Sequence, residues 1–279
     1  MVVFPNVKIN LGLFVTEKRP DGFHNIETIF FPVPGFNDVL EVINNTDGSD
    51  DQFSESGLET MTKKKENLVF KALDLLRKDH HIPPLKIHLH KNIPCGAGLG
   101  GGSSDAAFML KLLNEQYALD LSEKKLEKKA AELGADCAFF IRNQPTLARG
   151  TGNIFSPVNI SLTGLWIMIV VPPIHLSTPE AYQNIVPKPP AEKLEEIIKT
   201  PVEKWPESLN NDFEANAFSR YPKLAEIKSK LYKNEALYAA MSGSGSAVFG
   251  IFNNKPEITW EEENRVWFGE INDFGVNYS

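Results

Sequence analysis

The chain has 279 residues, 42% of them hydrophobic, and a formal net charge of −7. This length supports one large domain or two ordinary domains around apolar cores. The negative charge repels polyanions over a long range, which argues against nucleic acid and anionic membrane surfaces as general partners.

Only two cysteines occur, Cys95 and Cys137, which is too few for a disulfide framework or a four-cysteine zinc site. The first eight residues lack the basic flank and long apolar stretch of an export signal. No apolar run approaches the ~20 residues that cross a bilayer. We therefore expect a soluble cytoplasmic protein.

The first third of the chain predicts two strands followed by a helix. Residues 2–15 are rich in β-branched and aromatic side chains and end at the turn 19–22, and a second extended run covers 26–33. The polar stretch 44–62 predicts hairpin turns or a surface excursion, and we assign it no chemistry. Apolar residues then recur at helical spacing from Asn67, the expected N-cap.

The middle of the chain predicts a strand, a glycine-rich loop and two helices. Residues 85–90 alternate like a half-buried strand that leads into the loop. Helices are expected over 106–117 and from the cap Ser122 to Leu133, where Gly134 ends the second one.

An apolar strand over 165–171 follows a turn-rich stretch, which makes residues 155–163 the candidate domain boundary. We accordingly predict two domains, residues 1–158 and 159–279. The fold class indicated is mixed α/β.

The loop from Pro94 to Asp105 contains five glycines and two serines between a strand and a helix. Glycines reach positive φ, so successive N–H groups can form an anion nest that no Cβ obstructs. A helix that starts near Ser103 adds its electropositive end. The pattern predicts a polyphosphate site, and its structural alternative is a flexible glycine turn.

Three familiar motifs nearly match, and each fails on one requirement. The glycines at 96, 98 and 101 imitate a dinucleotide fingerprint, but a second helix follows where that motif needs a strand ending in an acidic residue. A Walker A loop needs lysine where Gly102 stands. Residues 273–275 imitate a protein-kinase metal motif without a preceding catalytic loop.

The glycine loop resembles the second motif of the GHMP kinase superfamily. The segments 5–13, 19–27, 134–137 and 241–247 stand in the order seen in one of its families, the kinase of the non-mevalonate isoprenoid pathway that acts on CDP-linked methylerythritol. The resemblance covers essentially the whole chain. It implies a ribosomal-protein-S5-like N-terminal domain, a ferredoxin-like C-terminal domain and a cleft between them.

The resemblance also implies that ATP binds along the glycine loop, with its base near two further residues. Asn67 has an alternative as a helix cap, and Lys91 as a surface charge. The implied ATP-binding residues are Pro94, Cys95, Gly96, Ala97, Gly98, Leu99, Gly100, Gly101, Gly102, Ser103, Ser104, Asn67 and Lys91.

Asp136 and Lys8 match the catalytic pair of this family. Phosphoryl transfer needs a carboxylate that accepts the hydroxyl proton and positive charge near the reacting oxygens. The resemblance therefore implies that Asp136 orients and deprotonates the alcohol, while Lys8 polarises it.

Phe23 and His24 match the pair that reads cytosine in the family, and Tyr182 matches an aromatic on the other face of the base. Stacking a base on an aromatic ring contributes ~1–3 kcal/mol. Packing in a core is the alternative for Phe23 and Tyr182. Asn10 and Thr178 are expected to contact the sugar-alcohol or phosphate part of the substrate.

Three positions depart from the family pattern, Val7, Phe23 and Ala138, and none removes a reacting group. Phe23 lacks the phenolic hydroxyl that tyrosine would supply, so cytosine affinity is the property most affected. His88 and His90 could form a metal pair, but no third ligand lies nearby in the sequence. Mg²⁺ is expected with ATP, and the sequence names no carboxylate ligand for it.

The predicted reaction is transfer of the γ-phosphate of ATP to the 2-hydroxyl of the methylerythritol part. Alternatives are a homoserine-type or mevalonate-type kinase, an ATP-dependent diphosphomevalonate decarboxylase, and a non-catalytic nucleotide sensor. Phe23 and His24 distinguish the cytidyl kinase from the other small-alcohol kinases. A mass spectrum of the product would separate the decarboxylase, and a position of Asp136 or Lys8 outside the cleft would favour the sensor. The oligomeric state is left open between monomer and homodimer.

Overall fold

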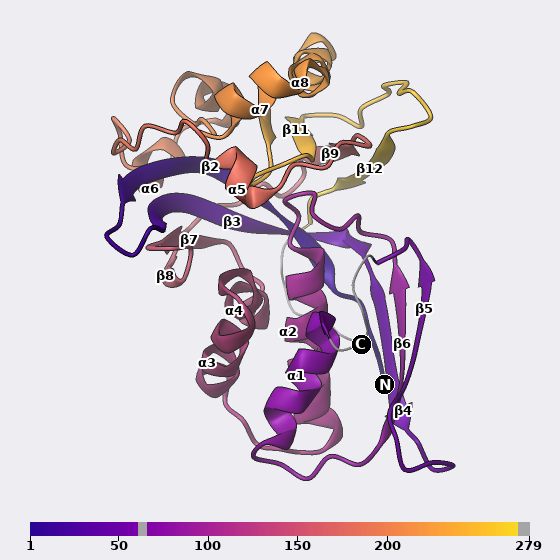
Figure 1. Cartoon of the computed structure of the whole chain (residues 1–279). Helices are drawn as coiled ribbons and strands as arrows, with labels where there is room; N and C mark the ends of the chain where they lie inside the picture. The colour runs from indigo at the N-terminus through magenta and orange to yellow at the C-terminus, as the bar shows by residue number, and fades with distance from the viewer. Residues whose placement is uncertain (61–65, 273–279) are drawn as a thin grey trace. The chain divides into compact units, whose positions relative to one another are not determined.

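The computed structural model describes residues 1–60 and 66–272, which form two compact units (Figure 1). Unit 1 comprises residues 1–7, 34–95 and 100–143, and unit 2 comprises residues 8–33, 96–99 and the described part of the chain from 144. Each unit is built from non-contiguous segments, so the boundary between residues 158 and 159 stays a prediction. The motif at 273–275 lies outside the described residues.

Unit 1 contains a four-stranded sheet in the order β1-β4-β6-β5. Its strands are β1 (Val2–Val3), β4 (Val39–Asn44), β6 (Leu85–Lys91) and β5 (Gln52–Gly57). Strand β4 pairs antiparallel with β6, whereas β5 pairs parallel with it. In β6 every second side chain is buried, which confirms the predicted half-buried strand.

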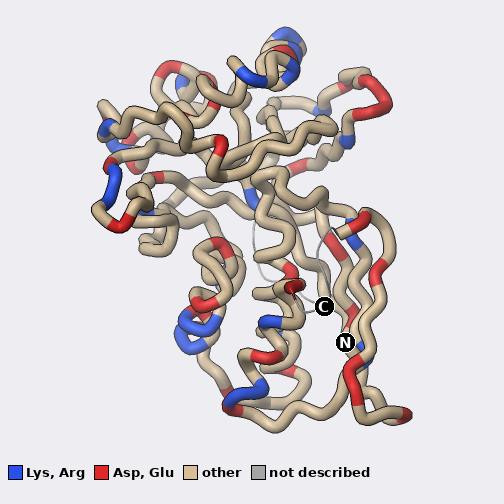
Figure 2. The backbone as a smooth tube through the Cα atoms, in the orientation of Figure 1, with Lys and Arg blue, Asp and Glu red and all other residues tan. Residues whose placement is uncertain are grey.

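Four helices lie on one side of this sheet in Figure 1. They are α1 (Leu68–Arg77), α2 (Gly101–Gln116), α3 (Glu123–Leu133) and α4 (Ala135–Arg142). In Figure 2 the tube of α3 carries both the blue of lysines and the red of acidic residues, as expected for a helix with few buried residues.

Unit 2 contains two further sheets, with orders β2-β3-β7-β8 and β10-β11-β9-β12. The first sheet consists of β2 (Asn6–Lys18), β3 (His24–Asn37), β7 (Thr146–Arg149) and β8 (Ile154–Pro157); β2 and β3 belong to unit 2 for most of their length. The second consists of β9 (Trp166–Val171), β10 (Tyr238–Met241), β11 (Val248–Phe252) and β12 (Arg265–Glu270).

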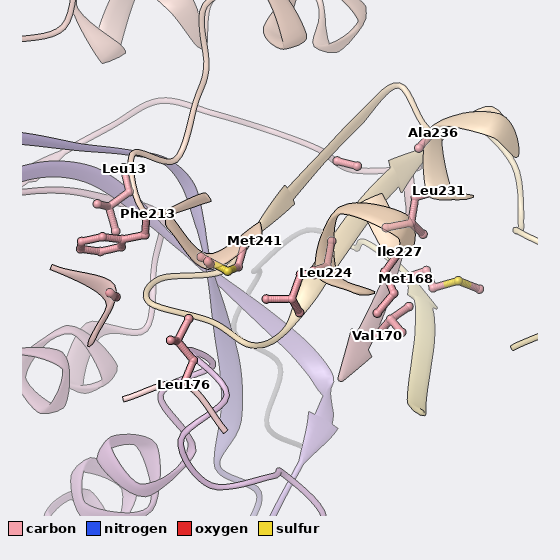
Figure 3. Packing of buried hydrophobic residues seen from close by; sticks show 14 of the residues in the cluster. Leu13, Met168, Val170, Leu176, Phe213, Leu224, Ile227, Leu231, Ala236 and Met241 are labelled. Carbon is pink, nitrogen blue, oxygen red and sulfur yellow. The ribbon is translucent and has the colours of Figure 1, made fainter. Parts of the chain in front are cut away.

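The helices of unit 2 are short, apart from α8. They are α5 (Thr178–Ala181), α6 (Leu194–Ile197), a 3₁₀ helix over Val202–Glu207, α7 (Glu214–Arg220) and α8 (Pro222–Lys233). Leu224, Ile227 and Leu231 of α8 join Met168 and Val170 of β9 in one buried cluster (Figure 3). Their spacing along α8 gives one apolar face, and burial of that face holds α8 in the unit.

Three predicted elements differ from the structure, and one helix was not predicted. The first expected strand is interrupted before β2 at Pro5, which has no N–H to donate to a ladder. The polar stretch contains β5, whose side chains are mostly exposed and therefore lack an apolar alternation. Helix α2 begins at Gly101 rather than near Ser103, and a new helix, α4, starts directly after Gly134.

Candidate functional site

The glycine loop alternates between left-handed glycines and buried apolar residues. Gly96, Gly98 and Gly100 have φ values of 70°, 76° and 73°. Ala97 and Leu99 between them are buried. Alternation of this kind turns backbone N–H groups toward a common point, which is the geometry of an anion nest.

Gly98 is required by its surroundings as well as by its φ. A Cβ at this position would lie 2.0 Å from the carbonyl oxygen of Ser242. The Ser242 hydroxyl also donates to the Gly98 carbonyl (2.9 Å), and the Ala247 N–H donates to the Ala97 carbonyl (3.0 Å). Residues 96–99 are thus fixed against the segment 241–247, the family motif near the end of the chain.

The far end of the loop forms the start of α2 in unit 1. A Cβ on Gly101 would lie 2.8 Å from Cγ2 of Ile93, so a glycine is needed for this close approach. The electropositive end of α2 favours an anion there. The Ser104 hydroxyl and Oδ1 of Asp105 are buried, and neither has a hydrogen-bond partner among the described residues.

Beneath the loop, Lys91 lies between two buried carboxylates. Its Nζ donates to Oδ2 of Asp105 at 2.8 Å and to Oδ2 of Asp38. The other oxygen of Asp38 accepts the N–H groups of Asn92 (2.7 Å) and Ile93 (2.9 Å), which directly precede the loop. The network therefore connects the end of β6, the start of the loop and the first turns of α2.

Burial and charge act in opposite directions in this network. Burial lowers the pKa of Lys91, but the negative charges of Asp105 and Asp38 outweigh it, so the net shift is upward. Burial raises the pKa of Asp105 to about 7, although the Lys91 ammonium opposes the rise. The surface charge considered for Lys91 is excluded, because its side chain is only 2% exposed.

Asn67 is the N-cap of α1, as predicted: its side chain accepts the N–H of Val69 at 2.9 Å. Its amide nitrogen also donates to Glu55 at 3.2 Å. A role in binding the ATP base stays a prediction for both Asn67 and Lys91. In the structure the side chain of Asn67 caps α1, and that of Lys91 pairs with buried carboxylates.

Asp136 lies in the first turn of α4, where the helix dipole favours a negative charge. The next residue, Cys137, is buried, and its thiol hydrogen-bonds Ser103 in the first turn of α2. Burial raises the pKa of this thiol to about 11, so Cys137 is a structural contact rather than a nucleophile. Asp136 therefore directly precedes Cys137, the residue that contacts the first turn of α2.

Lys8 and Asn10 lie side by side in β2 of unit 2. The Lys8 ammonium donates to Oδ1 of Asn10 at 2.6 Å, and the Asn10 amide donates to Thr28 at 3.0 Å. Lys8 also lies over the ring of Phe30, 4.9 Å from its centroid. These contacts fix the orientation of the ammonium of Lys8, a residue that is only 4% exposed.

Lys8 and Asn10 lie close to residues 96–99 and to the segment 241–247. The Lys8 N–H donates to the carbonyl of Leu99 at 3.0 Å. A Cβ placed on Gly243 would lie 3.2 Å from Oδ1 of Asn10 and 3.5 Å from Nζ of Lys8. Three predicted motifs therefore meet within unit 2: the lysine strand, the middle of the glycine loop and the segment 241–247.

Sequence reasoning missed Asn211, which positions this last segment. Its amide donates to the carbonyls of Met241 (2.8 Å) and Gly243 (2.9 Å), and its Oδ1 accepts the N–H of Phe213. No local pattern marks it, since the two carbonyls that its amide bonds lie 30 and 32 residues away.

The predicted cytosine-reading residues lie at and near the hairpin between β2 and β3. Phe23 is 67% exposed, which excludes the core alternative for it. His24 stacks on Tyr182, with ring centroids 4.7 Å apart and planes inclined by 17°. Tyr182 in turn packs edge-on against the buried Phe213. The ring of Tyr182 therefore packs directly on the ring of His24, and no space for a base lies between these two rings.

Thr178 and the histidine pair complete the predicted positions. The Thr178 hydroxyl lies 3.3 Å from that of Ser244, at the edge of the segment 241–247. His88 and His90 contact the hydroxyls of Ser54 and Ser56 on the neighbouring strand. Across residues 1–60 and 66–272, no group of three or more histidine, cysteine or acidic side chains has the arrangement of a metal site.

Comparison with known proteins identifies the family. Residues 67–144 match the model of the GHMP kinases N terminal domain, and residues 194–259 match the GHMP kinases C terminal model. A 4-diphosphocytidyl-2-C-methyl-D-erythritol kinase of Bacteroides thetaiotaomicron is 55% identical over 265 residues, covering 93% of this chain and 96% of that protein. The chain belongs to the 4-diphosphocytidyl-2-C-methyl-D-erythritol kinase family. The GHMP kinase architecture predicted from the sequence is confirmed.

Other relatives agree with this family. A 4-diphosphocytidyl-2-C-methyl-D-erythritol kinase of Parabacteroides distasonis is 53% identical over 276 residues, covering 97% of this chain and all of that protein. A crystal structure of 4-(cytidine 5'-diphospho)-2C-methyl-D-erythritol kinase superposes with a TM-score of 0.76 at 31% identity, with 90% of each chain covered.

A homoserine kinase of Cytophaga hutchinsonii shares the fold alone, with a TM-score of 0.68 at 17% identity and 96% and 95% of the two chains covered. In the described part of this chain, no helix combines the length and apolar character needed to cross a membrane.

Proposed function

We propose that this protein transfers the γ-phosphate of ATP to the 2-hydroxyl of 4-diphosphocytidyl-2-C-methyl-D-erythritol. The observation that carries the proposal is the 55% identity, over nearly the full length of both chains, to a kinase named for this substrate. The homoserine and mevalonate kinases and the decarboxylase among the structural neighbours are 14–17% identical and support only the common fold.

In this proposal the glycine loop binds the phosphates of ATP. The left-handed glycines at 96, 98 and 100 and the start of α2 supply backbone N–H groups and a positive dipole. Such groups stabilise charge on the transferring phosphoryl group because they are fixed before the reaction begins.

Asp136 is the proposed base. A carboxylate in the first turn of α4, next to the contact between Cys137 and Ser103, can orient the acceptor hydroxyl and take its proton. Lys8 is the proposed cation at the reacting oxygens, and its ammonium is oriented by Asn10 and Phe30. Asn10 and Thr178 are proposed to contact the alcohol or phosphate part of the substrate.

Mg²⁺ is proposed to accompany ATP. The Ser104 hydroxyl is a suitable oxygen donor, since it is buried at the start of α2 and has no hydrogen-bond partner among the described residues. Bound magnesium would neutralise charge on the phosphate oxygens, while the neighbouring Asp105 is held by Lys91.

Phe23 and His24 are the proposed readers of cytosine. The exposed ring of Phe23 offers a stacking surface, and the imidazole of His24 offers polar groups to the base edge.

Both cysteines are free, which supports a reducing, cytoplasmic location. The proposed reaction uses residues of one chain, so it is compatible with either a monomer or a homodimer.

The proposal is tested by ADP formation with two acceptors, the cytidyl substrate and the same alcohol without its cytidyl group. We expect turnover with the first and a much lower kcat/KM with the second. Equal kcat/KM values for the two acceptors would remove the role of Phe23 and His24, and no ADP with either would overturn the kinase assignment.

A further inference from the structure

The hairpin tip between β2 and β3 is held by an ion pair that the proposed reaction does not use. The guanidinium of Arg19 bonds both carboxylate oxygens of Asp21. Its Nε lies 3.2 Å from Oδ1 and 3.0 Å from Oδ2, and its Nη2 lies 2.7 Å from Oδ2. This bidentate geometry fixes the relative orientation of the two side chains. The opposite charges are visible together at this tip in Figure 2.

The same two residues hold the backbone of Phe23 on both sides. Oδ1 of Asp21 accepts the Phe23 N–H at 3.1 Å, and the Arg19 N–H donates to the Phe23 carbonyl at 2.8 Å. Gly22, with φ of 89°, closes the turn by donating its N–H to the Arg19 carbonyl. Both backbone polar groups of Phe23 are therefore bonded, although its ring is exposed.

Contacts beyond Phe23 extend the restraint to the start of β3. Nη1 of Arg19 lies 3.3 Å from Oδ1 of Asn25, whose amide donates to Glu17 at 2.7 Å. His24, between Phe23 and Asn25, is held on its ring face by Tyr182. Phe23 is thus fixed through its backbone by Arg19 and Asp21, and His24 is fixed through its ring by Tyr182.

An exposed aromatic ring on a turn normally loses conformational freedom when it binds a ligand, and that loss weakens binding. A hairpin tip whose backbone is already hydrogen-bonded in the free protein loses less conformational freedom on binding. An exposed ion pair contributes little to global stability, so stability alone does not account for this arrangement.

We propose that Arg19 and Asp21 are positioning residues that preorganise Phe23 and His24 for the cytosine of the substrate. The inference rests on the proposed function and deepens it: these residues affect selection of a cytidyl group without contacting it. Their side chains are 39% and 47% exposed, so replacements at both positions are compatible with folding.

The test compares Arg19→Ala, Asp21→Ala and Asp21→Asn with the parent enzyme, using ADP formation with the cytidyl substrate and with the alcohol lacking cytidine. We expect the two alanine variants to raise KM for the cytidyl substrate by about tenfold, the effect of losing restraint on one or two side chains, with kcat changed by less than about twofold. Asp21→Asn keeps an oxygen for the Phe23 N–H and should lie between parent and Asp21→Ala. The kinetics with the shorter alcohol and the KM for ATP should not change.

Lys199→Ala is the matched control, because it breaks an exposed ion pair in the same unit, with Glu196 at 2.8 Å, and neither partner forms a hydrogen bond or ion pair with residues 17–25. It should leave every kinetic constant unchanged, and all variants should keep the melting temperature of the parent within about 2 °C. If the parent prefers the cytidyl substrate and the alanine variants keep its KM, the positioning role is refuted while the proposed function stands. If the parent itself does not discriminate between the acceptors, the cytosine-reading role of Phe23 and His24 fails and the positioning role of Arg19 and Asp21 fails with it; no ADP with either acceptor would overturn the kinase assignment itself.

Discussion

Replacement of Lys91 by methionine removes the ammonium that, among the described residues, pairs with the buried carboxylates of both Asp38 and Asp105, while it keeps most of the length of the side chain. The three side chains are 2%, 0% and 4% exposed, so water cannot substitute for the missing ammonium. Removal of one partner from a buried ion pair costs about 3–5 kcal/mol, and we expect the free energy of unfolding to fall by this amount near pH 8.

The loss should depend on pH in a defined direction. Burial raises the pKa of Asp105 to about 7, above its ordinary value of 3.8, so the folded state binds this proton more tightly than the unfolded chain. The free energy of unfolding therefore falls as pH rises from about 4 to about 7. Without Lys91 that pKa rises further and the decline extends to higher pH, so Lys91→Met should be less destabilising at pH 5 than at pH 8.

Urea unfolding followed by circular dichroism at pH 5 and pH 8 measures both effects. The double variant Lys91→Met with Asp105→Asn is the control, because it removes the unpaired charge and should recover part of the stability lost near pH 8. A loss below about 1 kcal/mol at pH 8, or equal losses at the two pH values, would refute the assignment of this network as a buried ion pair.

Three further replacements test the site. Gly98→Ala should destabilise the protein by about 2 kcal/mol or more, because it adds a Cβ 2.0 Å from a carbonyl oxygen at a φ of 76°; an unchanged melting temperature would contradict this. Asp136→Asn should lower kcat by ~10²–10⁴-fold with unchanged thermal unfolding, and near-normal kcat would exclude the base. Phe23→Ala should raise KM for the cytidyl substrate by about 5- to 150-fold through lost stacking, and an unchanged KM in steady-state assays would show that the ring does not contact the base.

Sequence reasoning succeeded where a local pattern has a local cause. The alternation in residues 85–90 and the cap at Asn67 were both predictable, because strand pleating and helix capping act within a few residues. The turn expected at residues 19–22 is likewise a local signal, and Phe23 directly after it is exposed.

The elements that were missed depend on residues distant in the chain. Strand β5 pairs with β6 more than 30 residues away, and its polar side chains give no periodic signal. The ion pair of Lys91 with Asp38 was not foreseen, because Asp38 lies 53 residues before it. Asn211 was missed for the same reason: it holds the backbone of residues 241 and 243 through contacts that no motif encodes.

The central claim is the transfer of phosphate to one hydroxyl of the cytidyl substrate. Incubation with γ-¹⁸O-labelled ATP, followed by mass spectrometry of the fragmented product, locates the transferred group directly. We predict one labelled phosphate on the 2-hydroxyl for each ADP formed. Label in inorganic phosphate alone, or a product that has lost carbon dioxide, would contradict the account.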